Sequence, residues 1–234
     1  MTAPDDRPDR LLPIQEAVTR LHTFYGPLAL PPHDAFMMYV WEVLNFHAAP
    51  LKRDAAFGAL RRIPALTPDS ISKAAPKKVE AAVLLAGPYM DERIRALKAG
   101  ADMFRRHPDI PRRLNGALLE ARHALRWLPQ LGVAGFHRLL LFATTHPVIP
   151  ADAHLTRVAL RLGYGASASD VRKQVRSVRR ALNSAAPADL EPRRQTVLYL
   201  SHHGHTTCLE YDPHCHVCPL LEGCPYGRAR ITPS

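Results

Sequence analysis

Apolar side chains recur along this chain at the spacing of one face of an α-helix. Such stripes occupy residues 36–46, 53–63, 94–104 and 114–127, and Pro or Gly residues separate them. Runs that alternate apolar and polar residues, as half-buried strands do, are missing. Ala, Leu and Arg, which all favour helices, dominate instead. The pattern therefore predicts an all-α protein built from short helices with short connections.

A tight turn interrupts this pattern near the middle of the chain. One predicted helix ends at Pro129, the letters LPQLGV span residues 128–133, and a second helix is expected from Ala134 to about Thr145. Gly132 is expected to supply the unusual backbone angle of the turn. The free N–H groups at the start of the second helix, together with its dipole, suit a phosphate group. Taken alone, such a helix–turn–helix is more often structural than nucleic-acid binding.

The net charge of the chain also favours a negatively charged partner, but it does not establish one. The chain has 31 Lys and Arg residues against 21 Asp and Glu residues, a formal net charge of +10. This excess favours a polyanionic partner, although an ordinary basic surface would give the same count. The basic residues are spread over the predicted helices, which fits a binding face better than a disordered arm.

The N-terminal letters MTAPDDRPDR place acid, Pro and Arg where a secretory signal would need an apolar run. No stretch approaches the roughly 20 apolar residues of a membrane span. We therefore expect a cytoplasmic protein with no membrane association, in which thiols stay reduced.

All four cysteines fall in one short window with the spacing C-x6-C-x2-C-x5-C: Cys208, Cys215, Cys218 and Cys224. Reduced thiols packed this closely suggest one shared ligand set rather than two disulfides. Zinc modules usually have two CxxC-like pairs, and bacterial ferredoxins have C-x2-C-x2-C-x3-C, so neither pattern matches. The spacing alone leaves zinc and an iron–sulfur cluster open.

A single carboxylate stands before the next predicted helix, in the letters ADAH at residues 151–154. Asp152 in this position is most simply an N-cap, whose side chain accepts hydrogen bonds from free helix amides. The alternative is a carboxylate directed into a cleft, where it would do chemistry.

Taken together, LPQLGV, ADAH and HGHTTC (residues 203–208), followed by the cysteine spacing, resemble the endonuclease III branch of the helix-hairpin-helix DNA glycosylases. The order and the distances of these motifs match that family, and a weaker likeness extends upstream to about Phe36. The resemblance implies that Cys208, Cys215, Cys218 and Cys224 hold a [4Fe-4S] cluster with a structural role.

The resemblance also implies a fold of two α-helical domains with a DNA-binding cleft between them. A six-helix barrel domain would span residues 36–146, and an iron–sulfur domain would combine residues 1–35 with 147–234. Asp152 would lie at their junction as the catalytic carboxylate. The implied partner is double-stranded DNA with a damaged or mispaired base, bound by a monomer at the bacterial nucleoid.

The chain departs from the family at the hairpin. Bifunctional members carry a lysine in G-x-G-x-K, whose amine attacks the sugar and leads to strand cleavage. Here Gln130 replaces the first glycine and Ala134 stands where the lysine would be. The sequence thus predicts a monofunctional glycosylase that uses Asp152 and leaves the abasic site uncut.

Further DNA contacts are expected from three places. The hairpin would contribute Leu131, Gly132, Val133, Ala134 and Gly135. His47 would fill the space of the displaced base, and Tyr89 would stack on a base; a turn histidine and a packed tyrosine are the plain alternatives. The loop after Cys208 reads LEYDPH and lacks the basic residues usual in the family. These departures keep open a DNA-binding protein of this fold with little or no catalysis.

Overall fold

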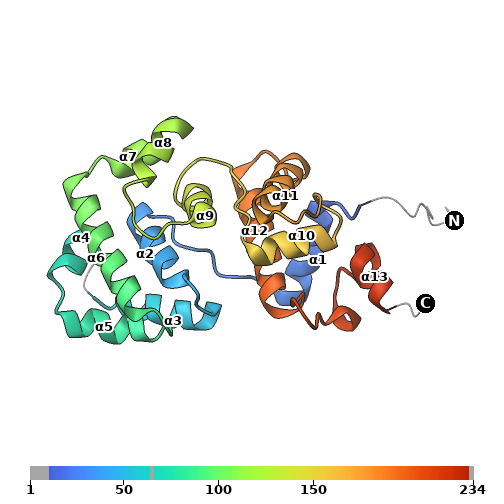
Figure 1. Cartoon of the computed structure of the whole chain (residues 1–234), viewed down its shortest axis with the longest axis horizontal. Helices are drawn as coiled ribbons and strands as arrows, with labels where there is room; N and C mark the ends of the chain where they lie inside the picture. The colour runs from blue at the N-terminus through green and yellow to red at the C-terminus, as the bar shows by residue number, and fades with distance from the viewer. Residues whose placement is uncertain (1–10, 64–65, 232–234) are drawn as a thin grey trace. The chain divides into compact units, whose positions relative to one another are not determined.

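The computed structural model describes residues 11–63 and 66–231, and every regular element in these ranges is helical, as the sequence predicts (Figure 1). The chain forms two compact units. One, here called the hairpin unit, is Pro31–Pro150; the other, the cysteine unit, joins the segment up to Leu30 with Ala151 onward. None of the described helices is long and apolar enough to cross a membrane.

The hairpin unit contains eight described helices, whose bounds are α2 (Ala35–Asn45), α3 (Pro50–Leu60), α4 (Pro68–Lys73), α5 (Pro76–Leu84), α6 (Met90–Arg106), α7 (Ile110–Leu114), α8 (Leu118–Leu125) and α9 (Val133–Ala143). Proline at the first positions of several of them starts the helix, because its missing N–H has no partner there in any case.

Helix α2 is the central element of this unit and is buried along nearly its whole length. It contacts α3, α6 and α9 (Figure 1). Tyr39 points into the core and donates a hydrogen bond to the Ala96 carbonyl at 2.6 Å. Gly100 makes room for this ring, since a Cβ atom there would lie 2.0 Å from it. An apolar stripe read from the sequence is thus the core of the unit.

One predicted helix is wrong in its extent. The apolar spacing suggested a continuous helix over residues 114–127, but Leu114 ends α7 and α8 begins only at Leu118. Asn115, Gly116 and Ala117 lie between them, and the Asn115 side-chain amide donates to the Pro111 carbonyl, which closes the first helix. Both Leu114 and Leu125 are buried, so the same apolar pattern serves two short helices.

The cysteine unit is built around α12 (Leu190–Thr206), which packs against α1 (Ile14–Tyr25) and α10 (Ala153–Arg161). Helix α11 (Val171–Ala185) packs on α10. Beyond α12 the chain has only two single-turn 3-10 helices, Cys215–Val217 and Leu221–Gly223, and the short α13 (Pro225–Ile231) within the described residues. The four cysteines lie in this last, weakly structured segment.

Candidate functional site

The hairpin between α8 and α9 places its strain at a position that the sequence did not suggest. Gly132 has an ordinary extended backbone, with φ of −70°, so its expected role in the turn is wrong. The left-handed angle falls on Gln130, with φ of +64°. The left-handed region favours glycine, and a non-glycine residue there costs on the order of 1 kcal/mol or more. The Gln130 side-chain oxygen is also buried, with no hydrogen-bond partner among the described residues.

Helix α9 begins with its first amides uncapped by any side chain of the described residues. Val133, at 67% exposure, projects from this end, while Leu131 and Ala134 are half-buried and Gly132 is exposed. These features suit the approach of a phosphate group to the free N–H groups.

Gly135 lies on the opposite, inner side of α9. It is buried, and a Cβ atom there would lie 2.8 Å from the Glu42 carboxylate. Glu42 in turn forms a buried ion pair with Arg138 at 2.5 Å, which joins α2 to α9. Glycine at position 135 therefore allows α9 to pack closely on α2. The hairpin residues expected to contact DNA thus do not all lie on one surface.

Asp152 caps α10. Its backbone is extended, and its side chain accepts the Leu155 N–H at 2.9 Å. The N-cap role that the sequence suggested for Asp152 is therefore present in the structure. Capping fixes the orientation of the carboxylate, which a charge with a chemical function also requires.

The start of α10 is held closely against the end of α12. A Cβ atom at Gly204 would lie 2.9 Å from the His154 carbonyl, so only glycine allows this approach. Arg157 bridges the same two helices, since its guanidinium donates to the Gly204 carbonyl at 2.5 Å and to the Cys208 carbonyl at 3.0 Å. The rings of His154 and His205 stack with centroids 3.6 Å apart. The backbone next to Asp152 is thus rigidly placed by the HGHTTC segment.

His47 and Tyr89 lie far apart in the sequence but meet in the hairpin unit. Their ring centroids are 5.1 Å apart, and the Phe46 ring packs on both, with centroids at 4.4 Å and 5.4 Å. Each has a left-handed backbone, with φ of +48° at His47 and +69° at Tyr89. Both residues are exposed, and Tyr89 is 45% accessible. Two separately predicted contacts therefore form one aromatic cluster.

A buried arginine joins the loop after α2, which carries His47, to the loop before α6, which carries Tyr89. No sequence pattern singled it out. Arg93 is 0% exposed. Its guanidinium donates to the carbonyls of Gly87 and Phe46, at 3.1 Å and 2.5 Å, and to that of Pro88. Burial lowers the pKa of Arg93 from its usual value. Carbonyl groups on both loops are thus satisfied by one side chain.

We expect Arg93→Met to lower the free energy of unfolding by about 1–3 kcal/mol, because it leaves buried carbonyls without a donor. Amide hydrogen exchange at residues 46–47 and 88–89 should accelerate as the loops separate. Urea unfolding and exchange measurements test this against Arg95→Met, a change on the same helix at a side chain that is 71% exposed. Equal stability of the two variants would show that the Arg93 contacts hold nothing together.

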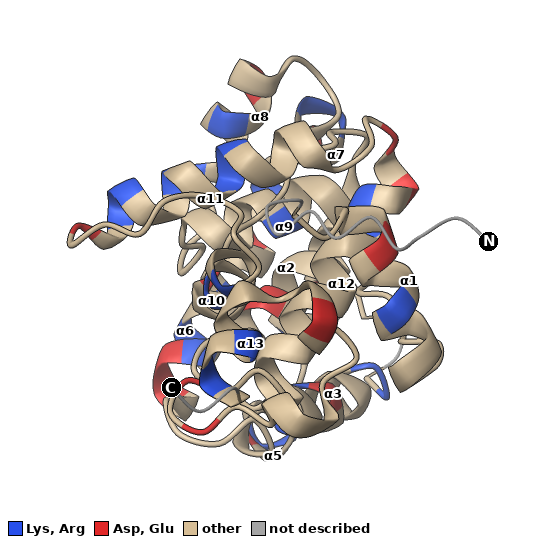
Figure 2. Cartoon of the chain, turned by 90° about the vertical axis from the view of Figure 1, so that its right-hand side faces the viewer, with Lys and Arg blue, Asp and Glu red and all other residues tan. Residues whose placement is uncertain are grey.

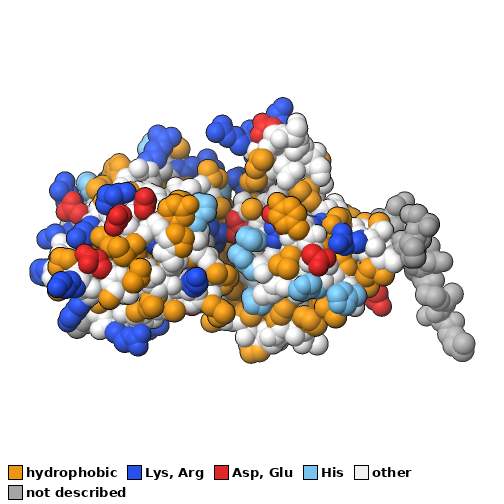
Figure 3. Space-filling model, turned by 60° about the horizontal axis from the view of Figure 1, so that its bottom comes forward, with side chains coloured by type: hydrophobic (Ala, Val, Ile, Leu, Met, Phe, Trp, Pro, Cys, Tyr) orange, Lys and Arg blue, Asp and Glu red, His pale blue; other side chains and the backbone are white. Residues whose placement is uncertain are grey.

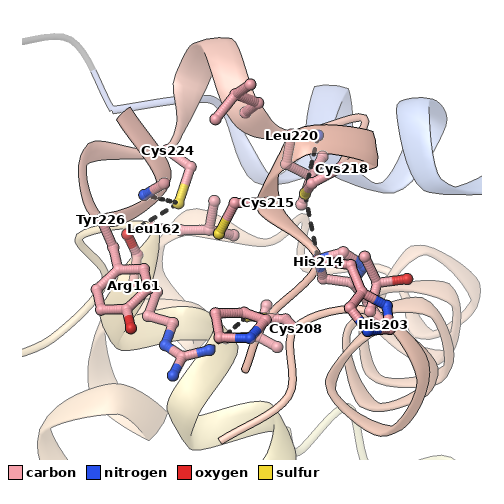
Figure 4. Close-up of a pocket in the computed structure, with 15 residues that line it drawn as sticks. Arg161, Leu162, His203, Cys208, His214, Cys215, Cys218, Leu220, Cys224 and Tyr226 are labelled. Carbon is pink, nitrogen blue, oxygen red and sulfur yellow. Dashed lines mark hydrogen bonds between the residues drawn. The ribbon is translucent and has the colours of Figure 1, made fainter. Parts of the chain in front are cut away.

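The four cysteines are free thiols that line one cavity between α10, α12 and the C-terminal segment (Figure 4). Backbone N–H groups point at two sulfurs, from Leu220 to Cys218 at 3.4 Å and from Gly227 to Cys224 at 3.3 Å. Such donors stabilise thiolates and are usual around cluster ligands. No two of these thiols form a disulfide, and folding brings all four to a single site.

Burial raises the pKa of the Cys218 thiol to about 11 and also raises the pKa values of Cys215 and Cys224. Such thiols carry protons at neutral pH, and a bound cationic group must displace them. Four sulfurs around one apolar cavity fit a cluster held by thiolates. Among the described residues, no three His, Cys, Asp or Glu side chains converge on the position of a single metal ion.

Arg161 closes the cavity on the side of the loop that follows Cys208. Its guanidinium donates to the Cys208 sulfur at 3.2 Å and to the Leu209 carbonyl at 2.6 Å, and it lies 4.3 Å from the centre of the Tyr226 ring (Figure 4). Arg157 and Arg161 occupy positions one helical turn apart on α10. That spacing was visible in the sequence, but their inward direction was not.

Curated endonuclease III proteins share part of this sequence, although no model of a known protein family matches the chain. A stretch of 118 residues, 50% of the chain, is 30% identical to endonuclease III of Haemophilus influenzae and covers 53% of it. Endonuclease III of Escherichia coli K12 is 31% identical over 112 residues, which are 48% of this chain and 50% of that enzyme. The matched stretch spans about half the length of these curated relatives.

Solved structures with the same fold cover nearly the whole chain. An endonuclease III in a non-covalent complex with DNA has a TM-score of 0.71 at 22% identity, covering 93% of this chain and 96% of that one. A thermostable thymine-DNA glycosylase has a TM-score of 0.69 at 17% identity, covering 92% of this chain and 97% of that one. At these identities the likeness establishes the fold.

Proposed function

We propose that the chain is a base-excision repair enzyme, because half of it is similar in sequence to endonuclease III and its fold is that of the helix-hairpin-helix DNA glycosylases. It hydrolyses the N-glycosidic bond of a damaged or mispaired base in double-stranded DNA. The observation that carries the proposal is Asp152, whose carboxylate caps α10 by accepting the Leu155 N–H, beside the close contact of Gly204 with His154.

Asp152 acts on the sugar. Breaking the bond between the sugar carbon and the base nitrogen builds positive charge on the sugar, and a preorganised carboxylate stabilises that charge. A water molecule then forms the new bond to the sugar carbon, and its proton ends on the departing base. The Leu155 N–H holds the carboxylate in place, so little reorganisation accompanies the reaction.

The target base must leave the stack before this chemistry, and damaged or mispaired bases cost least to extrude. We assign the aromatic cluster of His47 and Tyr89 to the vacated space, where rings stack on neighbouring bases. The free amides at the start of α9, from Val133 and Ala134, take a phosphate of the same duplex. Binding as a monomer, in the bacterial cytoplasm at the nucleoid, remains part of the proposal.

The reaction stops at the abasic site. Strand cleavage by this family's usual route needs a primary amine to form a Schiff base with the sugar, and Ala134 supplies none. The four cysteines would hold a [4Fe-4S] cluster, which would cross-link the loop that begins at Cys208 to the turns that carry Cys215, Cys218 and Cys224. Arg161 and the Leu220 and Gly227 amides would then face its thiolates.

The test is a panel of duplexes with one lesion or mismatch each, incubated with the wild-type protein. We expect strand breaks only after alkali treatment, and no protein–DNA adduct after borohydride reduction. An adduct, or breaks without alkali, would contradict the monofunctional assignment and point to an amine elsewhere in the chain.

A second function is favoured by the strained Gln130 and by the missing lysine at Ala134. A hairpin altered at both positions suits a protein that binds DNA or lesions with little or no catalysis. Salt-sensitive duplex binding without product on any duplex of the panel would support this alternative.

A further inference from the structure

Helix α11 exposes a row of positive charge that the proposed chemistry does not use. Arg172, Arg176 and Arg180 follow one another at intervals of four residues, so they lie on one face, and Lys173 flanks them. All four side chains are exposed. Figure 2 shows the basic positions following one another along α11. These four residues are called the α11 stripe.

The stripe has no acidic partner among the residues that the structure describes. Arg20, Arg194 and Arg230 of the cysteine unit form ion pairs with carboxylates, and none of these pairs involves a residue of the stripe. Helix α11 itself contains no Asp or Glu. The nearest carboxylate in sequence, Asp170, accepts the backbone N–H groups of Arg172 and Lys173 as the N-cap.

Like charges one turn apart repel each other and weaken a helix. Helix α11 is held in spite of this by its opposite face, where Val178 and Leu182 are fully buried. Gly165 fits against that face, since a Cβ atom there would lie 2.9 Å from the Val178 backbone. The fold therefore maintains a rigid row of cations, spaced about 6 Å apart along the axis.

The loop between Cys208 and Cys215 has the opposite character. It contains Glu210 and Asp212 and no Lys or Arg. The Asp212 side chain is 88% exposed and pairs with Arg230 at 3.4 Å. Within the described part of the cysteine unit, the α11 stripe thus offers unpaired positive charge, and the loop that follows the first cysteine does not.

We propose that the α11 stripe binds the phosphate backbone of double-stranded DNA, as a sequence-independent contact outside the lesion site. The inference rests on the proposed function insofar as that function supplies the duplex. Arginine and lysine at regular intervals, without carboxylates between them, neutralise phosphates and release counterions.

The test is the salt dependence of binding to an undamaged duplex, for the variant Arg172→Gln/Arg176→Gln/Arg180→Gln. Removing one cation from a phosphate lowers the slope of log affinity against log salt by about 0.9. We expect the slope to fall by about 2 to 3 and the affinity at moderate salt to fall about tenfold or more. The charge-retaining variant Arg172→Lys/Arg176→Lys/Arg180→Lys should keep the wild-type slope.

The matched control is Lys73→Gln/Lys77→Gln/Lys78→Gln, which removes three charges at exposed positions of α4 and α5. Figure 3 shows that Lys and Arg are plentiful on the hairpin unit, so net charge must be controlled in this way. Equal slopes for the two glutamine triples would overturn the inference, as would a wild-type slope in the α11 variant. Thermal melts confirm that each variant is folded.

Because this assay uses undamaged DNA, its result does not depend on excision. A chain that releases no base, but whose salt slope falls in the α11 variant, would retain the inference and lose the catalytic proposal. A chain that excises bases while the α11 variant binds like its control would do the reverse.

Discussion

Asp152→Asn is expected to reduce base release about a hundred- to a thousandfold while leaving duplex binding intact. The size follows from removing one preorganised charge that acts on the transition state. Asparagine is as good an N-cap as aspartate, so its side-chain oxygen can still accept the Leu155 N–H. The change therefore removes the negative charge and keeps the helix start. Single-turnover excision on a reactive duplex of the panel measures the effect.

Two companion variants separate chemistry from stability at this position. Asp152→Ser also preserves the cap and should be as inactive as Asp152→Asn. Asp152→Ala loses both the charge and the cap, and should unfold with about 1 kcal/mol less free energy than the other two. If Asp152→Asn excised bases at the wild-type rate, the carboxylate would be only a cap and the catalytic assignment would fall.

Cys218→Ala is expected to remove the bound cluster and release the C-terminal segment. The segment after α12 has few buried apolar side chains, chiefly Leu220, so the cross-links carry most of its stability. We expect a loss of several kcal/mol in unfolding free energy, because metal binding and folding are coupled in such small modules. Iron content and absorbance at about 410 nm, from thiolate-to-iron charge transfer, report the loss of the cluster. Limited proteolysis reports the release of the segment, and thermal melts report the loss of stability.

Val217→Ala is the control for this change. It alters the neighbouring side chain, which is 52% exposed, and should keep both the colour and the melting temperature. A wild-type protein that is colourless and holds stoichiometric zinc would contradict the cluster assignment. A Cys218→Ala protein with full iron would show that this thiol is no ligand.

The helical fold could be predicted from the sequence because apolar periodicity is a local property. The stripes over 36–46 and 94–104 correspond to α2 and α6. The break between α7 and α8 could not be read in this way, since Leu114 and Leu125 continue the apolar spacing across it. The sequence also led to a wrong prediction for the turn. Gly132 was expected to take the left-handed backbone angle, but Gln130 takes it.

By itself, the sequence determined the helical class, the spacing of the four thiols, and the residue types at Asp152 and at Ala134 in the hairpin. Each of these is a matter of residue type at a fixed separation along the chain. Only the tertiary structure decided that His47 and Tyr89 form one aromatic cluster, that Arg93 joins their loops, and that the α11 stripe is unpaired among the described residues. These features depend on contacts between distant segments and on which side chains the core leaves exposed, and both are set by packing.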